Sequence, residues 1–206
     1  MKHEWRKHEK QYYLPKQEPE IVEMPIFKFF TIEGEGNPND EFFTEYIGVL
    51  YSLSYAVKMS PKKGMQPDGY FDYTVYPLEG VWDLKEEAKE TYSESLNKDD
   101  LVFKLMIRQP DFVTAEFAQK ILEFVKKNKP HKLLDEVNFE AISEGKCIQM
   151  LHCGSYDDEL ESFAQMEQFA KDNGLERKHK SHREIYLTDA RKTAPEKLKT
   201  VLRFTI

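Results

Sequence analysis

Apolar positions along the chain follow two spacings, and each spacing predicts a different kind of element. Alternation of apolar with polar residues is typical of strands, whereas apolar residues three and four positions apart are typical of helices. Strands are therefore expected at 25–35, 70–77, 101–108, in two stretches within 136–153, at 182–188 and at 198–206. Helices are expected from about 40 to 59, from 114 to 128 and from about 158 to 173, and the polar segment 83–100 is expected to be a short exposed helix or an excursion.

The order of these elements repeats. The turns at 36–40 and 154–158 share the pattern Gly-x-x-Asx-Asp, and each follows a strand and opens a helix that two strands follow. The sequence therefore predicts an α+β fold: a duplicated strand–helix–strand–strand unit with pseudo-two-fold symmetry, antiparallel sheets with helices on one face, and a central ligand groove. We expect an extended N-terminal lead-in at 1–24 and one domain at 25–206, with halves at about 25–130 and 131–206.

One strand near the C-terminus carries the most informative side chain, Glu184. In this strand Ile185 and Leu187 share a face and are expected to pack under the helices. Glu184 and Tyr186 then share the opposite face. A carboxylate beside an aromatic ring is costly to desolvate, so it requires a partner, a raised pKa or a function. Glu184 and Tyr186 are therefore the candidate catalytic residues, and a solvated glutamate paired with Arg183 is the alternative.

Residues on other predicted faces are candidates for lining the groove. Strand faces that carry tyrosine, methionine and isolated charges suit a semi-polar cavity better than a sealed core. Trp82 ends a strand and could cover the groove, and ordinary packing at the edge of the sheet is the alternative. For Tyr51 and Tyr55, on the first predicted helix, the alternative is a position in the core. The candidate ligand-binding residues are Tyr70, Tyr76, Trp82, Tyr51, Tyr55, Lys104, Met106 and His152.

Composition and charge restrict the partners. A net charge of −7 argues against nucleic acid, because a phosphate backbone requires a concentrated basic face. No apolar run approaches the ~20 residues of a membrane span, and the first residues lack the apolar stretch of a signal peptide. Two cysteines too far apart to bridge fit a reducing compartment. We expect a small organic ligand, no nucleic acid, no membrane, a cytoplasmic location, and a monomer or homodimer.

The sequence contains no clear metal or cofactor motif. His152 and Cys153 are adjacent, so in a strand they face opposite ways and make a poor metal pair. His179, His182 and Glu184 could form a ligand set only if their hairpin bent favourably. The glycine pattern of a dinucleotide site is also absent. We therefore expect no metal and no cofactor.

Several longer strings resemble a known family. The resemblance is to the GyrI-like small-molecule-binding proteins, in their long stand-alone branch, and it spans almost the whole chain through FFTIEGEGNPND, IGVLYSLSYAVK, YFDYTVYPLEGVWDL, LVFKLMIRQPDFVT, LHCGSYDDE and HREIYLTDARK. It implies the duplicated fold with a ligand groove between the copies. It also implies that Glu184 matches an acidic residue that meets cationic, lipophilic drugs in the effector-binding domains of multidrug-responsive activators.

The resemblance leaves three functions open. Some GyrI-like proteins hydrolyse cyclopropane-bearing DNA-alkylating toxins, a detoxifying activity in which water adds to the strained ring. Here Tyr186 or Tyr76 would donate to the conjugated carbonyl, Glu184 would orient or deprotonate the water, and Trp82 would stack on the substrate. The alternatives are a non-catalytic module that sequesters or senses a ligand in the same groove, and a gyrase-inhibitor-like regulator with DNA gyrase as its partner.

Overall fold

The computed structural model describes residues 2–90 and 97–206, and the chain folds into two compact units. Unit 1 comprises Met1–Glu4, Phe27–Leu78 and Leu84–Ile142, and unit 2 comprises Trp5–Ile26, Glu79–Asp83 and Ser143–Ile206. Both units combine antiparallel strands with helices, so the predicted α+β class is confirmed. Each unit joins segments that lie far apart in the sequence, so no single point along the chain divides them.

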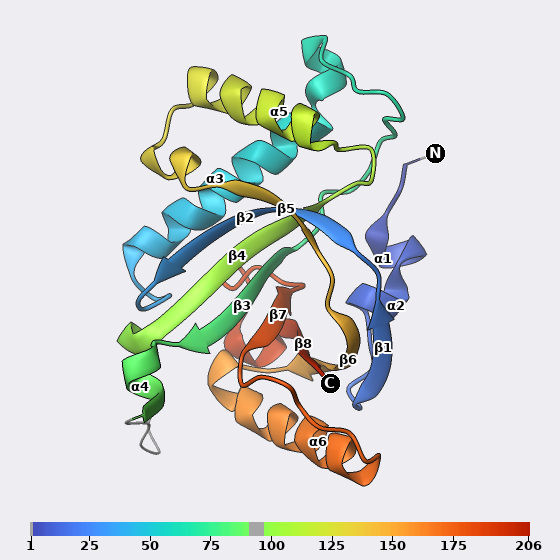
Figure 1. The fold of residues 1–206 in the computed structure, drawn as a ribbon, viewed down its shortest axis with the longest axis vertical. Coiled ribbons are helices and arrows are strands. Elements are labelled where there is room, and N and C mark those ends of the chain that lie inside the picture. Colours follow the sequence, from blue (N-terminus) through green and yellow to red (C-terminus); the bar gives the residue numbers. More distant parts are fainter. Residues whose placement is uncertain (1, 91–96) are drawn as a thin grey trace. The chain divides into compact units, whose positions relative to one another are not determined.

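Unit 1 is built on a sheet with the strand order β4-β2-β5. β4 (Leu101–Gln109) and β5 (Asn138–Ile142) pair antiparallel with the two edges of β2 (Phe27–Glu35). Helices α3 (Glu41–Lys58) and α5 (Ala115–Asn128) pack on each other, and α3 also contacts β2 and β4 (Figure 1). The predicted strands at 25–35 and 101–108 and both predicted helices of this unit are confirmed to within two residues at each end.

Unit 2 contains five antiparallel sheet strands, and β3 belongs to this unit through its residues 79–83. The strand order is β1 (Glu20–Met24), β6 (Gly145–Cys153), β8 (Lys199–Thr205), β7 (His182–Tyr186) and β3 (Leu78–Leu84). Helix α6 (Glu159–Asp172) covers one face of this sheet. The core between the helix and the sheet consists of Ile148, Met150, Met166, Ala170, Leu202, Phe204 and Ile206.

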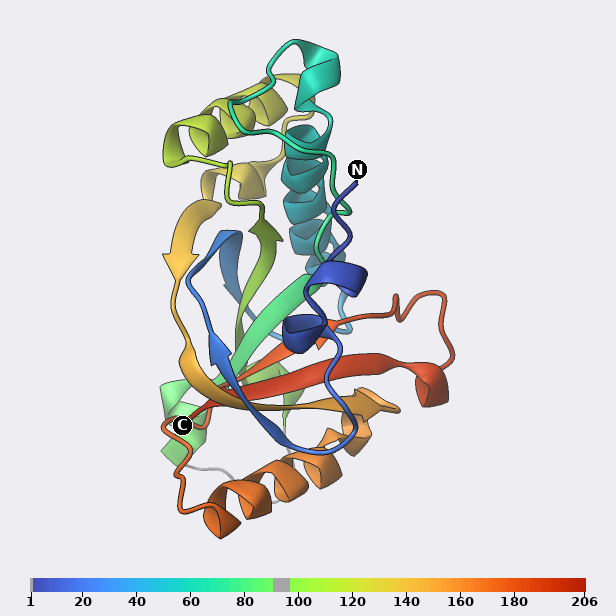
Figure 2. The same ribbon diagram turned by 90° about the vertical axis from the view of Figure 1, so that its right-hand side faces the viewer.

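The opposite face of this sheet is covered by the N-terminal segment, which forms α1 (Trp5–His8) and α2 (Lys10–Tyr13) (Figure 2). Arg203 donates to a backbone carbonyl of this segment at 2.6 Å. The rings of Trp5 and Tyr13 lie 5.2 Å apart and are 3% and 2% exposed. The prediction of an extended lead-in at 1–24 is therefore wrong for residues 5–8 and 10–13, which form helical turns, whereas Glu20–Met24 is extended as β1.

A second prediction of local structure is also wrong. Residues 70–77 form no continuous strand and contribute only an isolated bridge between Tyr73 and His3. The buried tyrosines here, Tyr73 and Tyr76, are three positions apart, a spacing that one face of a strand cannot accommodate. In the polar segment 83–100 the structure contains the short helix α4 (Glu86–Glu90), and residues 91–96 lie outside the described residues.

Candidate functional site

β7 places three side chains that carry chemistry on one face of the unit 2 sheet. Glu184 is the register partner of Leu202 in β8, and Leu202 belongs to the core beneath α6. Because side chains alternate along a strand, His182, Glu184 and Tyr186 all face the side of the sheet that α6 covers. The predicted shared face of Glu184 and Tyr186 exists, but it is the helix side and not the side away from the helices.

The other face of β7 carries Ile185 and Arg183, so the predicted orientation of Ile185 under the helix is wrong. Arg183 is 4% exposed, and its Nη1 lies 2.7 Å from Glu79 Oε2. Its Nε lies 2.9 Å from Glu144 Oε1, an ion-pair contact without hydrogen-bond geometry. A paired charge can be buried as an apolar side chain can. Both faces of β7 are therefore interior, and apolar alternation could not tell them apart.

A chain of hydrogen bonds joins Trp82, Tyr186 and Glu184. Trp82 donates from Nε1 to the hydroxyl of Tyr186 at 2.7 Å, and Tyr186 donates to Oε2 of Glu184 at 2.8 Å. The other carboxylate oxygen, Oε1, lies 3.0 Å from His182 Nε2, which donates when that nitrogen carries the proton. Glu184 is only 9% exposed, so these side chains replace water as its hydrogen-bond partners and fix its orientation.

A second buried carboxyl group meets Glu184. Glu159 is the first residue of α6 and is 6% exposed. Burial, followed by the charge of Glu184 and a hydrogen bond with it, raises the pKa of Glu159 to about 10. The helix dipole favours an ionised carboxyl group at this end of α6, but desolvation outweighs that effect. Glu159 is therefore protonated near neutral pH and keeps a proton that it can donate to Glu184.

Aromatic rings border the two carboxyl groups. The ring of Tyr156 lies edge-on to Tyr186 at 5.9 Å, and Phe163 lies edge-on to His182 at 4.6 Å. Burial, and then the charge of the neighbouring carboxylate, raises the pKa of Tyr156 to about 12 and that of Tyr186 well above its ordinary value, so both hydroxyls stay protonated. Tyr156 is 37% exposed and Leu160 is 75% exposed, so apolar surface continues from the site to solvent.

Glu159, His182 and Glu184 could also surround a metal ion. One oxygen or nitrogen atom from each lies within 4.8 Å of the others. One imidazole and two carboxylates suit zinc and similar divalent ions. The sequence led us to expect no metal and no cofactor, and both expectations stay predictions.

The comparison with known families decides which family the chain belongs to. A model of the GyrI-like small molecule binding domain matches residues 17–206. The chain belongs to the GyrI-like family. The resemblance read from the sequence is thereby confirmed, and so is binding of a small molecule as the general function of the domain.

Solved structures extend the comparison. A hydrolase from Listeria innocua is 35% identical, with a TM-score of 0.87 over 98% of both chains. Another hydrolase structure from the same organism is 36% identical, with a TM-score of 0.89 over 99% of this chain and 98% of that one. The C-terminal domain of EcmrR shares the fold alone, at 12% identity and a TM-score of 0.55 over 91% of this chain and 96% of that domain. None of the curated proteins matches.

The predictions about partners fare differently. Across residues 2–90 and 97–206, none of the helices combines the length and apolar character that crossing a bilayer requires. EcmrR in complex with DNA is also similar, at 14% identity and a TM-score of 0.50 over 97% of this chain and 61% of that one. The expected lack of nucleic-acid binding therefore stays a prediction, as do the cytoplasmic location, the oligomeric state and the gyrase alternative.

Unit 2 of this GyrI-like protein brings together three of the predicted site residues, Trp82, Glu184 and Tyr186. His152 belongs to the same unit but lies beneath α6, where its Nδ1 is 2.9 Å from Ser162 Oγ and its Nε2 is 2.9 Å from the carbonyl of Ser155. It also lines a shallow depression of about 290 Å³. These contacts tie the start of α6 to the sheet, and a ligand-binding role for His152 stays a prediction.

The remaining predicted residues belong to unit 1, and several have strong local partners. The guanidinium of Arg108 lies 4.5 Å from the ring of Tyr76, which is 2% exposed. Lys104 Nζ lies 3.0 Å from a carboxylate oxygen of Glu33 and 3.0 Å from one of Glu140. These contacts stabilise unit 1, and the ligand-binding role of Tyr76 and Lys104 stays a prediction.

The other four vary in exposure. Tyr70 donates to the carbonyl of Lys58 at 2.8 Å, and Met106 is fully buried in the core. Tyr51 and Tyr55 lie on α3 with ring centroids 6.2 Å apart, and Tyr55 is 53% exposed. A ligand-binding role for these four residues is likewise still a prediction.

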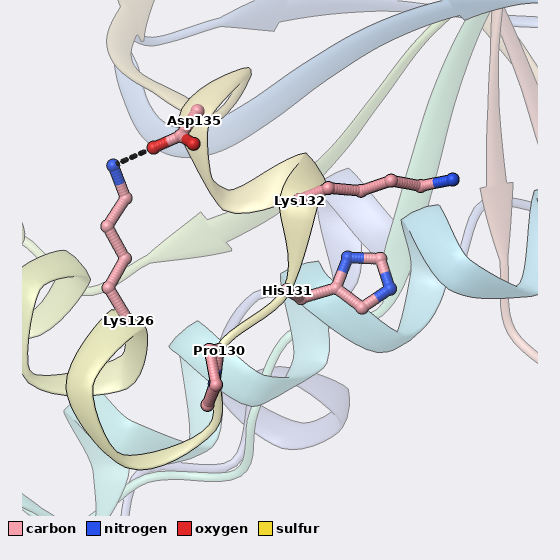
Figure 3. Close-up of a pocket in the computed structure, with 5 residues that line it drawn as sticks. All are labelled: Lys126, Pro130, His131, Lys132 and Asp135. Atoms are coloured by element: carbon pink, nitrogen blue, oxygen red, sulfur yellow. Dashed lines mark hydrogen bonds and ion pairs between the residues drawn. The ribbon is translucent and has the colours of Figure 1, made fainter.

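A larger depression lies in unit 1, and none of the predicted site residues lines it. It has a volume of about 420 Å³ and is lined by Lys126, Pro130, His131, Lys132 and Asp135 (Figure 3). Lys126 and Asp135 form an ion pair across it at 2.5 Å. Its walls are charged and solvated, and they lack the aromatic surface that a lipophilic ligand requires. We therefore do not assign the functional site there.

Sequence reasoning missed the contribution of α6 to the site. Leu160, in the first turn of α6, is apolar but 75% exposed. The buried side of α6 runs instead through Glu159, Ser162 and Met166, which are spaced three and four apart. That spacing could have revealed Glu159, but a glutamate in the first helical turn usually reads as an exposed charge at the helix N-terminus. The residues missed in this way are Tyr156, Glu159 and Phe163, together with the site role of His182.

Proposed function

We propose that this GyrI-like protein binds flat, lipophilic aromatic molecules beside Tyr156 and Tyr186, and that it hydrolyses cyclopropane-bearing alkylating toxins. The observation that carries the proposal is the burial of Glu184 together with its hydrogen-bond partners. Its carboxylate is buried, both of its oxygens are held by neighbouring side chains, and among the described residues no lysine or arginine pairs with it. Identity of 35–36% with proteins described as hydrolases supports a reaction with water.

In the proposed reaction the main role of the protein is to position a base and a water molecule beside the strained ring. Glu184 accepts a proton from a bound water while the water oxygen attacks a carbon of the strained ring. The ring C–C bond breaks, and its electron pair moves into the conjugated carbonyl of the toxin. A positioned base contributes about 10²–10⁴ in rate, and ring strain supplies much of the remaining driving force. Because Tyr186 already donates its single hydroxyl proton to Glu184, its role in this proposal is to orient the base.

Aromatic surface supplies the binding energy. Tyr156 is partly exposed beside the carboxylate, and Leu160 extends the apolar surface outward. Burying a large aromatic ligand against such side chains is favourable at roughly 25 cal/mol per Å² of apolar area. A ligand that carries a positive charge would gain further from the neighbouring carboxyl groups and from contact with the tyrosine rings.

The test compares turnover in two matched variants. Chelator-treated protein is incubated with a cyclopropanoid alkylating agent, and the water adduct is followed by mass spectrometry. We expect Glu184→Gln to lose about 10²-fold or more of the turnover while it still binds the intact toxin. Glu161→Gln makes the same chemical change at an exposed position of α6 and should turn over as the wild type does.

Two results would decide against this proposal. If Glu184→Gln keeps full turnover, Glu184 is not the base. If the wild-type protein binds the toxin stoichiometrically without turnover, the domain is a sequestering or sensing module. Co-purification with a large partner such as DNA gyrase would instead favour the protein-regulator alternative.

A further inference from the structure

The carboxyl groups at the start of α6 lack a counter-charge of the usual kind. Among the described residues, neither Glu159 nor Glu184 pairs with a lysine or arginine, and the one basic group that Glu184 contacts is His182. Two carboxyl groups that meet in a buried site are stabilised either by a shared proton or by a cation. A cation in this position would be held by all three side chains.

Glu159 provides a second and independent sign of a ligand. It is more than nine-tenths buried, and in the part of the chain that the structure describes its Oε1 has no hydrogen-bond partner. The large majority of buried side-chain polar atoms in proteins have a hydrogen-bond partner, and leaving one without a partner is unfavourable. One oxygen of this carboxyl group lies within 4.8 Å of the ligand atoms of His182 and Glu184, so it is directed into the cluster and not away from it.

The distances suit a small divalent cation. In a tetrahedral zinc site the ligand atoms lie about 2.0–2.2 Å from the ion and therefore about 3.3–3.6 Å from one another. His182 Nε2 and Glu184 Oε1 are already 3.0 Å apart, and all three ligand atoms lie within 4.8 Å of each other. Side-chain movements of about 1 Å would complete the coordination.

Hydrogen bonds from neighbouring side chains fix the orientation of Glu184, as such bonds commonly fix the ligands of metal ions. Oε2 of Glu184 accepts the hydrogen bond from Tyr186, which in turn accepts one from Trp82, and this leaves Oε1 directed at His182. Carboxylate ligands of metal ions are commonly fixed by such a second hydrogen bond. His182 is half-buried, with 22% of its side chain exposed, so an ion and a water can reach the cluster from this side.

We propose that Glu159, His182 and Glu184 form a binding site for one zinc ion, or a first-row divalent ion of similar ligand preference, with a fourth position open to water. The mixed nitrogen and oxygen donor set disfavours Mg²⁺ and Ca²⁺, which prefer oxygen ligands alone. The site goes beyond the proposed hydrolysis and does not depend on it, because metal binding is measured without substrate.

The experiment is a titration of tag-free, chelator-treated protein with Zn²⁺, followed by calorimetry. We expect one zinc per chain, and we expect Glu159→Gln and His182→Gln each to abolish the tight site. X-ray absorption of the zinc-loaded protein should show one nitrogen and two oxygen ligands from the protein at about 2.0–2.2 Å. Titration with Mg²⁺ should give no heat of specific binding.

His179→Gln is the matched control, because His179 lies in the loop just before β7, is exposed, and belongs to the ligand set that the sequence analysis considered. It should bind zinc as the wild type does. Equal loss in His179→Gln, retention in both ligand variants, or no binding by the wild type would overturn the site. Circular dichroism of each variant, with Glu159→Asp as a second variant that keeps the carboxylate, separates loss of ligand from loss of fold. Turnover of the chelated wild type, measured separately, tests the hydrolase alone.

Discussion

The two faces of β7 bury charge in opposite ways. On one face Arg183 contacts Glu79 and Glu144, and Arg203 contacts Glu144, so positive and negative groups alternate. On the other face Glu184 meets a second carboxyl group, Glu159, and its other partners are a tyrosine and a histidine. Both faces are interior to unit 2, but only the first is balanced in charge.

The difference shows how a structural ionic network can be told from a candidate site. A buried ion-pair network that serves stability compensates each charge, because an uncompensated one costs several kcal/mol. In a site that binds a proton, a cation or a substrate, the buried charges are often not compensated by neighbouring groups. The pKa values of such groups are therefore shifted from their ordinary values. Glu159 and Glu184 follow the second pattern, and the proposed site rests on that difference.

The largest effect on stability is expected from a substitution that removes one charge from the balanced face of β7. Arg183→Met leaves Glu79 buried without its partner, and we expect the free energy of unfolding to fall by about 3–5 kcal/mol. Urea denaturation measures this. Arg191→Met is the control, because Arg191 pairs with Asp189 at 2.8 Å but 72% of its side chain is exposed. That change should cost about 0–1 kcal/mol, and equal losses in the two variants would remove the distinction.

The unbalanced face should respond to pH. Because the pKa of Glu159 is raised from 4.5 to about 10, the metal-free folded protein keeps a proton that the unfolded chain releases throughout that range. The free energy of unfolding should therefore fall as pH rises from about 5 to 10, by at most about 1.4 kcal/mol per pH unit. Glu159→Gln removes this contribution, whereas Glu161→Gln does not. Urea unfolding at about pH 5, 7 and 9 measures the slope, and parallel slopes for all three proteins would contradict the shift.

Loss of the Tyr186 hydroxyl group tests whether its hydrogen bond to Glu184 contributes to stability and to zinc binding. Tyr186→Phe removes one donor to Glu184 and leaves Trp82 Nε1 without its acceptor, so we expect a cost of about 1–3 kcal/mol in unfolding free energy. Zinc affinity should weaken about 10- to 100-fold. Tyr55→Phe, at a 53% exposed position, should change stability by less than about 0.5 kcal/mol. If zinc binding is unchanged in Tyr186→Phe, the outer hydrogen bond does not support the site.

The smallest effect concerns the two thiols. Burial raises the pKa of Cys147 to about 12, even though Arg203 and Arg183 lie nearby and lower it. Cys153 is exposed. Iodoacetamide at about pH 8 should therefore modify Cys153 and leave Cys147 unmodified, as peptide mass spectrometry would show. Modification of Cys147 at a similar rate would mean that the balanced face of the sheet opens readily.

The sequence predicted most elements because their patterns are local. The helix at 114–128 begins where Thr114 accepts a hydrogen bond from Phe117 N at 3.1 Å, a cap that is legible in the sequence. Strands β2, β4, β7 and β8 follow from alternation over five or more residues. Tyr73 and Trp5 could not be placed in this way, because each owes its position to aromatic partners that no periodic pattern records.

The site was predicted in part. Glu184 and Tyr186 were found together because a strand puts alternate residues on one face, whatever the fold around it. The sequence did not show which face of β7 lies under α6, because Arg183 and Ile185 on the other face are both buried. Apolar alternation therefore could not distinguish the two faces. Glu159 was missed because a glutamate at the start of a helix usually faces solvent.

By itself, the sequence determined the class of the fold, the membership of the GyrI-like family and the pairing of Glu184 with Tyr186, since each depends on local spacing or on shared strings. Only the tertiary structure decided that α6 covers the Glu184 side of β7 and brings Glu159 to meet it. The physical reason is that burial and the meeting of like charges depend on which elements pack together. A carboxyl group far away in the chain changes nothing until the fold places it within hydrogen-bond reach.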